Sequence, residues 1–427
     1  MLVDPARSSR QAILSAVLLV LGGIALAYTL ARAALLSFTH DESVTYLHFV
    51  DAPLLETLRY NGFSPSNNHL LNSLLMRMSA TLFGPGELAL RLPSWLGHVL
   101  YVAAAVLLVR RMRHPLAAVC TFVLLLANPF LLDFFSLARG YGLAMGLMLA
   151  GVYVLVTTLE EAAPRPVRAV AAFALLAGAA LAHFGFLNVY LAAAAVLLGF
   201  ALQRRAMRTA GAVAVLSGLF VAGVLPTLLK LKNGGELYHG GEVGFVADTV
   251  RSLVESALYG EHPLHRPGRP MALAVAALVL FLASALVVWT RRRRPAAGAV
   301  DDGAVVSAIA VVTAVGILLQ HHLFGTRFVI DRSALFFLPL FFLTLGAAVD
   351  REIEAGGRMG RTLFAGAYGV LSLLLLVHTA GRANLTHTDA WRYDADTERM
   401  IEALAARAPS KERPRKTLGV FWAYEPA

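Results

Sequence analysis

The sequence predicts an all-α protein that crosses a membrane many times. Hydrophobic residues make up 58% of the 427 positions and charged residues only 15%, so the chain is more apolar than a soluble globular domain. Apolar runs of about 20 residues, the length that crosses a hydrocarbon core as a helix, recur along most of the chain. Clusters of arginine lie in alternate connections between these runs, as is typical of the cytoplasmic loops of a polytopic membrane protein.

About eleven transmembrane helices follow from these runs. The expected spans are residues 12–36, 93–109, 115–132, 142–159, 167–186, 187–203, 209–229, 271–290, 303–324, 333–349 and 362–381. They form one transmembrane domain over residues 1–381, with large extracytoplasmic loops at 37–92 and 230–270 and a short extracytoplasmic tail at 382–427. Amphipathic helices that lie in the membrane interface are expected in the first of these loops.

The formal net charge of +10 does not indicate a nucleic-acid partner, because the basic residues are spread over alternate loops, such as Arg291 to Arg294. The positive-inside rule places these loops and the N-terminus in the cytoplasm. An odd number of spans then places the tail outside a plasma (inner) membrane. A signal peptide cleaved near Ala33 is the alternative for the first span, but the apolar run is longer than a usual signal core.

Two adjacent carboxylates, Asp41 and Glu42, follow the first span. In low-dielectric surroundings beside a like charge, one carboxylate can have a pKa near the working pH while the other stays ionised, which suits general-base catalysis. Both are therefore candidate catalytic residues. The alternative is a capping box, in which Thr39 accepts a hydrogen bond from the third helical residue and Glu42 reaches back to the cap. Such a cap would leave Asp41 free to face a substrate.

The first outer loop contains two candidate interfacial helices. Residues 43–60 place leucines mostly on one side and are interrupted near Pro53. Residues 69–83 form an apolar face of leucine and methionine, with His69 and Arg77 on the polar side. An amphipathic helix of this kind can shape an entrance for a lipid, so His69 and Arg77 are candidate substrate-binding residues. A plain surface anchor is the alternative.

Three further candidates lie at the outer ends of spans. Arg139 and Tyr141 stand where the fourth span begins, and His183 lies near the outer end of the fifth. A charge at the outer end of a span is costly unless it is paired or hydrated, which favours a functional role. The alternatives are snorkelling of Arg139 to the interface and simple packing of His183.

Arg327 and Arg332 lie between the ninth and tenth spans, close in sequence to His321, His322 and Asp331. The two arginines could neutralise a phosphate, so both are candidate substrate-binding residues. A local pair between Asp331 and Arg332, or contacts to lipid headgroups, would explain the charges equally well.

The second large outer loop is rich in glycine, but it lacks the Gly-Lys-Ser/Thr ending of a nucleotide-binding loop. His262 and His265 make only a weak metal pair, because Pro263 interrupts the helical geometry that would align them. In the tail, residues 394–406 predict a helix and residues 418–422 resemble a strand. We expect the tail to pack on the outer loops.

Four short motifs stand after the first expected span and at the entries of the second, fourth and tenth. They are His40-Asp41-Glu42, residues 87–94 (ELALRLPS), Ala138-Arg139-Gly140-Tyr141 and residues 331–339 (DRSALFFLP). In this order the chain resembles, over residues 10–350, the GT-C superfamily of lipid-linked glycosyltransferases. The likeness is greatest to the family 39-like type that includes protein O-mannosyltransferases and lipid A aminoarabinose transferases. The sequence departs from that pattern at residues 64–69 (SPSNNH), where relatives often carry His or Lys followed by two prolines.

The resemblance implies a GT-C-like fold and transfer of a sugar, with inversion, from a polyprenyl-phosphate carrier to a lipid, glycan or protein acceptor on the extracytoplasmic face. It implies Asp41 as general base and Glu42 as its support, with Arg139, Arg327 or Arg332 stabilising the departing lipid phosphate. Membrane lipids would be further partners, and no nucleic acid is expected. No metal site is predicted and no cofactor is certain, although a divalent cation bridging Asp41 and Glu42 stays open.

Two other classes of protein stay open. A transporter or flippase would also have many helices and outer arginines, but such proteins usually carry ionisable residues near mid-membrane and internal repeats, and the sequence indicates neither. A noncatalytic scaffold would explain the hydrophobicity. It would have no need of adjacent carboxylates beside an amphipathic helix and arginines at two outer mouths.

Overall fold

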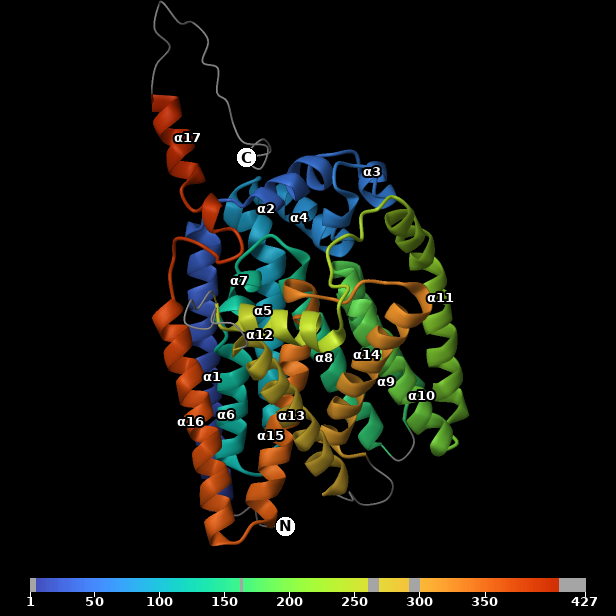
Figure 1. The fold of residues 1–427 in the computed structure, drawn as a ribbon, viewed down its shortest axis with the longest axis vertical. Helices are drawn as coiled ribbons and strands as arrows, with labels where there is room; N and C mark the ends of the chain where they lie inside the picture. The colour runs from blue at the N-terminus through green and yellow to red at the C-terminus, as the bar shows by residue number, and fades with distance from the viewer. Residues whose placement is uncertain (1–4, 162–163, 260–268, 292–299, 407–427) are drawn as a thin grey trace, which may run out of the picture.

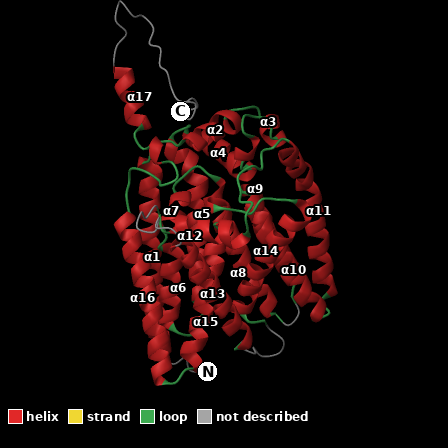
Figure 2. Cartoon of the chain, viewed as in Figure 1, coloured by secondary structure: helices red, strands yellow, loops and turns green. Residues whose placement is uncertain are grey.

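A computed structural model describes residues 5–161, 164–259, 269–291 and 300–406. Within them the chain forms helices and loops and no strand, as Figures 1 and 2 show. Long helices run side by side, and the short helices of the first outer loop lie across one end of them (Figure 1). A single antiparallel bridge joins Gly241 to Phe328.

The long helices are α1 (Pro5–Leu35), α5 (Glu87–Val109), α8 (Gly140–Glu160), α10 (Leu187–Gln203), α11 (Met207–Asn233), α13 (Arg269–Thr290), α14 (Asp302–Phe324), α15 (Phe337–Ala355) and α16 (Arg358–Arg382). Shorter helices between them are α6 (Pro115–Leu126), α7 (Pro129–Phe135), α9 (Pro166–Ala182) and α12 (Arg251–Ala257). The first outer loop contains α2 (His40–Thr45), a π-helical turn (Tyr46–Val50), α3 (Leu54–Arg59) and α4 (Leu70–Phe83), and the tail contains α17 (Thr397–Ala406).

Eight helices in the described part of the chain are long and apolar enough to span a membrane, and a ninth span results if the bent pair α6 and α7 is counted as one. Each of the eleven expected segments contains a helix, but the count of eleven spans is not confirmed. α9 has only 17 residues, because the chain becomes extended at His183. α15 carries Asp350, Arg351, Glu352 and Glu354 near its end, which shortens its apolar part.

The third and fourth expected spans are joined partly by a buried helix, α7, and not only by a short loop. The Asn128 side chain accepts a hydrogen bond from the Leu131 N–H, and Pro129 occupies the first turn of α7, so the chain begins a new helix there. α7 is inclined by 63° to α6. Its Asp133 carboxylate lies 2.6 Å from the Arg32 guanidinium of α1, and the burial of this charge is thereby compensated.

Glycines bring α5 and α8 into close contact at the centre of the bundle. A Cβ atom on Gly97 would lie 2.6 Å from the Gly142 carbonyl oxygen, and one on Gly146 would clash with the Gly97 backbone. Small residues at helix interfaces let backbones approach closely, which is how helices associate in a membrane without a hydrophobic driving force. The start of α8, which carries Arg139 and Tyr141, is therefore fixed against α5.

The first outer loop has the two predicted helical regions. The break near Pro53 is present, since α3 begins at Leu54. α4 has the expected two faces: Met78 and Leu82 are exposed, whereas Ser73 is buried against the loop. The exposed leucine and methionine side chains suit a helix that lies on a membrane.

The first part of the tail contacts both the bundle and the first outer loop. The Arg32 guanidinium donates a 2.8 Å hydrogen bond to the His387 carbonyl oxygen, and Ser37 Oγ donates to the Ala395 carbonyl oxygen. The expected tail helix forms as α17, whereas the strand-like residues 418–422 lie outside the described residues.

Candidate functional site

The start of α2 forms the predicted capping box. Thr39 Oγ1 accepts from the Glu42 N–H, and Glu42 Oε2 accepts from the Thr39 N–H at 2.9 Å. The cap uses Thr39 and Glu42 and leaves the Asp41 side chain directed elsewhere. The structural and functional interpretations of this segment therefore hold together.

Glu42 is fully buried and forms an ion pair with Arg91 of α5. Arg91 Nε lies 2.9 Å from Glu42 Oε1, and both side chains have 0% exposure. The remaining Arg91 donors bind the carbonyl oxygens of Ala33, Leu36 and Ser37 at the end of α1. Arg91 thus joins the end of α1 to the start of α2.

The charge of Glu42 is stabilised within this buried corner. Burial alone would raise the pKa of Glu42, but the Arg91 guanidinium and the N–H groups of Ala138 and Thr39 hold that pKa below its ordinary value. The Ala138 N–H donates to Glu42 Oε1 at 2.5 Å, which also ties the start of α8 to this corner. Glu42 is therefore a buried, ionised group next to Asp41 that ties α1, α2 and the start of α8 together.

The Asp41 carboxylate lies between two guanidinium groups. Asp41 Oδ2 is 3.3 Å from Arg139 Nη2 and 3.9 Å from Arg332 Nη2. The Asp41 side chain is 19% exposed and that of Arg332 is 29% exposed, whereas Arg139 is buried. A substrate can therefore reach the carboxylate and one of its two arginines.

Arg139 is held from several sides at the mouth of α8. Its Nη1 donates to the Asp41 carbonyl oxygen and to Thr45 Oγ1, and its own carbonyl oxygen accepts from Ser94 Oγ at 2.7 Å. Gly140 follows it because a Cβ atom there would clash with the Ala182 carbonyl oxygen and the His69 ring. The close approach explains the glycine of the Ala-Arg-Gly-Tyr motif.

His69, Tyr141 and His183 come together behind Arg139. The ring centroids of His69 and His183 are 4.9 Å apart, and those of Tyr141 and His183 are 4.2 Å apart. Burial, with nearby Arg139, His183 and Arg332, holds the pKa of His69 well below its ordinary value. A lowered pKa favours the neutral imidazole. The buried Nε2 of His69 has no hydrogen-bond partner among the described residues.

The alternative of a local ion pair between Asp331 and Arg332 is not what the contacts of the two side chains show. Asp331 has a left-handed backbone with φ of 46°, and its carboxylate accepts from Ser256 Oγ at 3.1 Å. Arg332 is directed toward Asp41 and stacks on Trp391 of the tail. Adjacent residues in a 3₁₀ turn project in different directions, so the two side chains take different partners.

Arg77 and Arg327 lie outside this group in the structure. Arg77 donates to the carbonyl oxygens of Phe49 and Ala52 and thereby holds the first outer loop. Arg327 pairs with Glu242 at 2.7 Å and is 44% exposed. Their proposed roles in substrate binding find no support in these contacts.

An apolar cavity of about 570 Å³ lies among α12, α13, α15 and α16. Of its lining side chains, only Thr249 and His378 are polar. α12, which lines it, is joined to the Arg332 turn, because Ser252 Oγ accepts from the Asp331 N–H at 2.9 Å. The apolar lining suits a hydrocarbon chain, and this hydrogen bond connects one wall of the cavity to the turn that carries Arg332.

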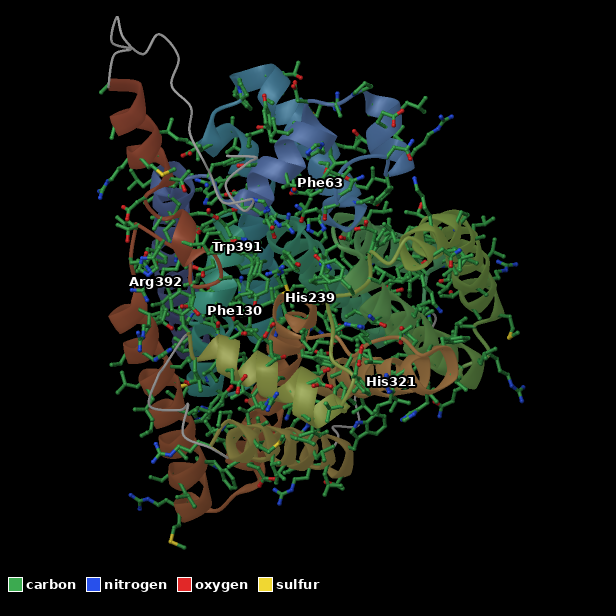
Figure 3. The ribbon with its side chains drawn as sticks, turned by 45° about the horizontal axis from the view of Figure 1, so that its top comes forward. Phe63, Phe130, His239, His321, Trp391 and Arg392 are labelled. Carbon is green, nitrogen blue, oxygen red and sulfur yellow. The ribbon has the colours of Figure 1, made fainter. Side chains whose placement is uncertain are left out.

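Sequence reasoning gave no role to three residues that lie in or beside this group. Arg91 stands in the motif at residues 87–94, just before the span expected at 93–109, and a lone charge at that place indicates a buried partner such as Glu42. His239 is an exposed histidine of the second outer loop, near enough to Asp41 and Arg332 for their charges to act on it. Trp391 comes from the tail, and in Figure 3 both His239 and Trp391 lie between the blue helices of the first loop and the yellow α12. No sequence signal pointed to either.

The carboxylates of Asp41 and Glu42 face different arginines, so they do not share one ligand position. Among the described residues, no group of three or more His, Cys, Asp or Glu side chains could hold a metal ion. His262 and His265 lie outside the described residues. The question of a divalent cation, which the sequence leaves open, stays open, and no step below uses one.

Asp394 offers a pH-dependent test of how the tail is attached. Its Oδ2 accepts the His40 N–H at 2.8 Å, and burial raises its pKa to about 6. Because an unfolded aspartate has a pKa near 4, folding favours the protonated form, and stability is lost as the pH rises from about 4 to about 6. Between pH 5 and pH 7 this group should lower the free energy of unfolding by on the order of 1 kcal/mol. In thermal unfolding experiments in detergent, Asp394→Asn should not show this contribution to the pH dependence of stability. A pH dependence equal to that of the wild type would contradict the prediction.

No protein-family model and no curated relative matches the sequence. Chains of solved structures do match, and two of them are from ArnT. ArnT from Cupriavidus metallidurans bound to undecaprenyl phosphate has a TM-score of 0.50 and 15% identity, over 90% of this chain and 75% of that chain. The apo state of ArnT from the same organism has a TM-score of 0.43 and 16% identity, over 91% of this chain and 75% of that one.

The likeness to the lipid-bound structure is one of fold, and it extends over most of this chain. It agrees with the order of motifs that resembles the GT-C superfamily. The chain is therefore an all-α, multi-pass membrane protein with a GT-C-like fold.

Proposed function

We propose that the protein transfers a sugar from a polyprenyl-phosphate carrier to an acceptor at the extracytoplasmic face, with inversion. The observation that carries this proposal is the Asp41 carboxylate between the guanidinium groups of Arg139 and Arg332. The apolar cavity beside the Arg332 turn supports it. ArnT, which has a similar fold, binds undecaprenyl phosphate, a ligand with one phosphate and one long apolar chain.

Asp41 would act as the general base. It would take the proton of an acceptor hydroxyl while the hydroxyl oxygen forms a bond to the anomeric carbon of the sugar. The bond from that carbon to the phosphate oxygen breaks in the same displacement, and its electron pair leaves with polyprenyl phosphate. A single displacement inverts the anomeric centre and needs no covalent intermediate between sugar and protein.

Arg332 is the arginine best placed to receive the phosphate. Its Nη2 is 3.9 Å from Asp41, beyond hydrogen-bonding distance, and its side chain remains partly exposed. Arg139 already donates to the Asp41 carbonyl oxygen and to Thr45. An arriving phosphate would therefore bind Arg332 at little cost, while Arg139 keeps Asp41 in place. Both guanidinium charges would stabilise the phosphate as it departs.

Substitution of Arg332 tests the proposal. Loss of a charge-assisted contact should weaken the binding of undecaprenyl phosphate by roughly tenfold to a hundredfold in Arg332→Ala. Arg332→Lys should restore little, because an ammonium lacks the planar fork of a guanidinium. The exposed Arg392→Ala is the matched control and should bind like wild type. Binding can be measured by titrating the lipid in detergent and following thermal stability.

Equal affinity in wild type and Arg332→Ala would remove Arg332 from the phosphate site and make Arg139 the leading candidate. An absence of any saturable binding to the wild type would contradict the proposed donor class. Stability without lipid should be close to wild type in each variant, which separates binding from folding.

The proposed orientation is testable with single cysteines. In a Cys120→Ala background, Asp51→Cys in the first outer loop should react with an impermeant thiol reagent added to intact cells. Arg110→Cys, at the opposite end of α5, is the matched control and should react only after permeabilisation. The first outer loop and the end of α5 lie at opposite ends of the bundle (Figure 1). The reverse labelling pattern would invert the orientation.

A further inference from the structure

Trp391 brings a residue of the tail to the catalytic corner. It lies between α16 and α17, more than 340 positions after Asp41 in the sequence, and is only 3% exposed. The Arg332 guanidinium carbon is 5.1 Å from the centroid of the Trp391 ring. The ring also meets Phe134 of α7 edge-on, with centroids 6.0 Å apart. Trp391 thus contacts both α7 and Arg332.

The tail is fixed to the bundle on the approach to Trp391. Tyr28 OH donates to the Asn384 carbonyl oxygen at 3.1 Å, and Arg32 Nη2 donates to the His387 carbonyl oxygen at 2.8 Å. Arg32 is itself paired with the buried Asp133. These contacts come from α1 and α7, which are part of the packed bundle, so the position of the Trp391 ring is set independently of Arg332.

We propose that Trp391 is a positioning residue that holds the Arg332 guanidinium in place for the lipid phosphate. This inference rests on the proposed function. A cation–π contact uses the face of the guanidinium, whereas hydrogen bonds to a phosphate use the N–H groups at its edge. The ring can therefore restrain Arg332 without occupying the donors that a phosphate needs.

Arg332 needs such a restraint because its other contacts are few. It lies 3.9 Å from Asp41 and is close to the Tyr141 hydroxyl. A free arginine side chain has many rotamers, and ordering it on binding reduces affinity. A guanidinium that is already stacked on Trp391 loses less freedom when the phosphate arrives. The tail then contributes to donor binding without touching the donor.

The test compares aromatic and aliphatic replacements of Trp391. In titrations with undecaprenyl phosphate, Trp391→Leu should weaken binding by about threefold to thirtyfold, and Trp391→Phe should restore most of it. In an Arg332→Ala background, Trp391→Leu should have no further effect on affinity. Trp289→Leu is the matched control, because Trp289 Nε1 donates to Ser307 Oγ in another part of the bundle. It should leave lipid affinity unchanged.

The outcomes separate this inference from the proposed function. Suppose that Arg332→Ala weakens binding. If Trp391→Leu then binds like wild type, or no worse than Trp391→Phe, the inference is overturned and the function stands. A further loss from Trp391→Leu in the Arg332→Ala background also overturns it, because the effect would not pass through Arg332. If the wild type shows no saturable binding, the proposed function itself fails. Should Trp391→Leu not fold, Trp391→Met takes its place, and affinity equal to that of Trp391→Phe overturns the inference.

Discussion

Asp41→Asn should lower turnover by on the order of a hundredfold or more, the usual loss when a general base is removed. Asparagine keeps the shape of the side chain but cannot accept the acceptor proton at neutral pH. The capping box uses Thr39 and Glu42, so the substitution should leave α2 intact. Turnover can be followed in proteoliposomes as the loss of sugar-loaded carrier lipid in the presence of a membrane extract that supplies the acceptor.

Asp51→Asn is the control for this experiment. Asp51 lies in the same outer loop, is exposed, and is outside the capping box. It should retain wild-type turnover. Expression and binding of undecaprenyl phosphate should be unchanged in both variants. Near-normal turnover in Asp41→Asn would remove Asp41 from the role of base.

Arg91→Met should cause the largest loss of stability. It would leave Glu42 charged and fully buried with its guanidinium partner removed, which costs about 3 to 5 kcal/mol in known cases. Three carbonyl oxygens at the end of α1 would lose their donors at the same time. Thermal unfolding in detergent should show a large drop in the midpoint temperature.

Two comparisons identify the buried charge as the cause. Adding Glu42→Gln to Arg91→Met removes that charge and should recover part of the lost stability. Arg111→Ala also breaks an ion pair, but the Arg111 and Asp302 side chains are 24% and 31% exposed, so it should cost about 1 kcal/mol or less. An equal loss in Arg91→Met and Arg111→Ala would show that burial does not matter at this corner.

The parts of the fold that depend on local pattern could be predicted from the sequence. Apolar runs located the helices, and the Thr-x-x-Glu spacing located the start of α2. Each of these signals depends only on residues that are close together in the sequence. The number of transmembrane spans was harder to predict from the sequence. Whether α6 continues past Asn128, and where α9 stops before His183, depends on the packing of the ends against other helices.

The partners of the site residues could not be predicted in the same way. The sequence places Arg332 beside Asp331, but the left-handed backbone at Asp331 turns the two side chains apart. Glu42 meets Arg91 and Trp391 meets Arg332 only because distant segments pack together. The order of the short motifs compensated in part, since the resemblance that it supports grouped Asp41 with Arg139, Arg327 and Arg332. The structure brings Arg139 and Arg332 to Asp41, whereas Arg327 pairs with Glu242.

Mass spectrometry of the lipid that copurifies with the protein tests the central claim most directly. The account predicts that polyprenyl phosphate is extracted from the wild type, that the sugar-loaded carrier accumulates on Asp41→Asn, and that both are reduced on Arg332→Ala. The mass of the loaded carrier would also identify the sugar. Extraction of ordinary phospholipids alone from all three proteins would contradict the account.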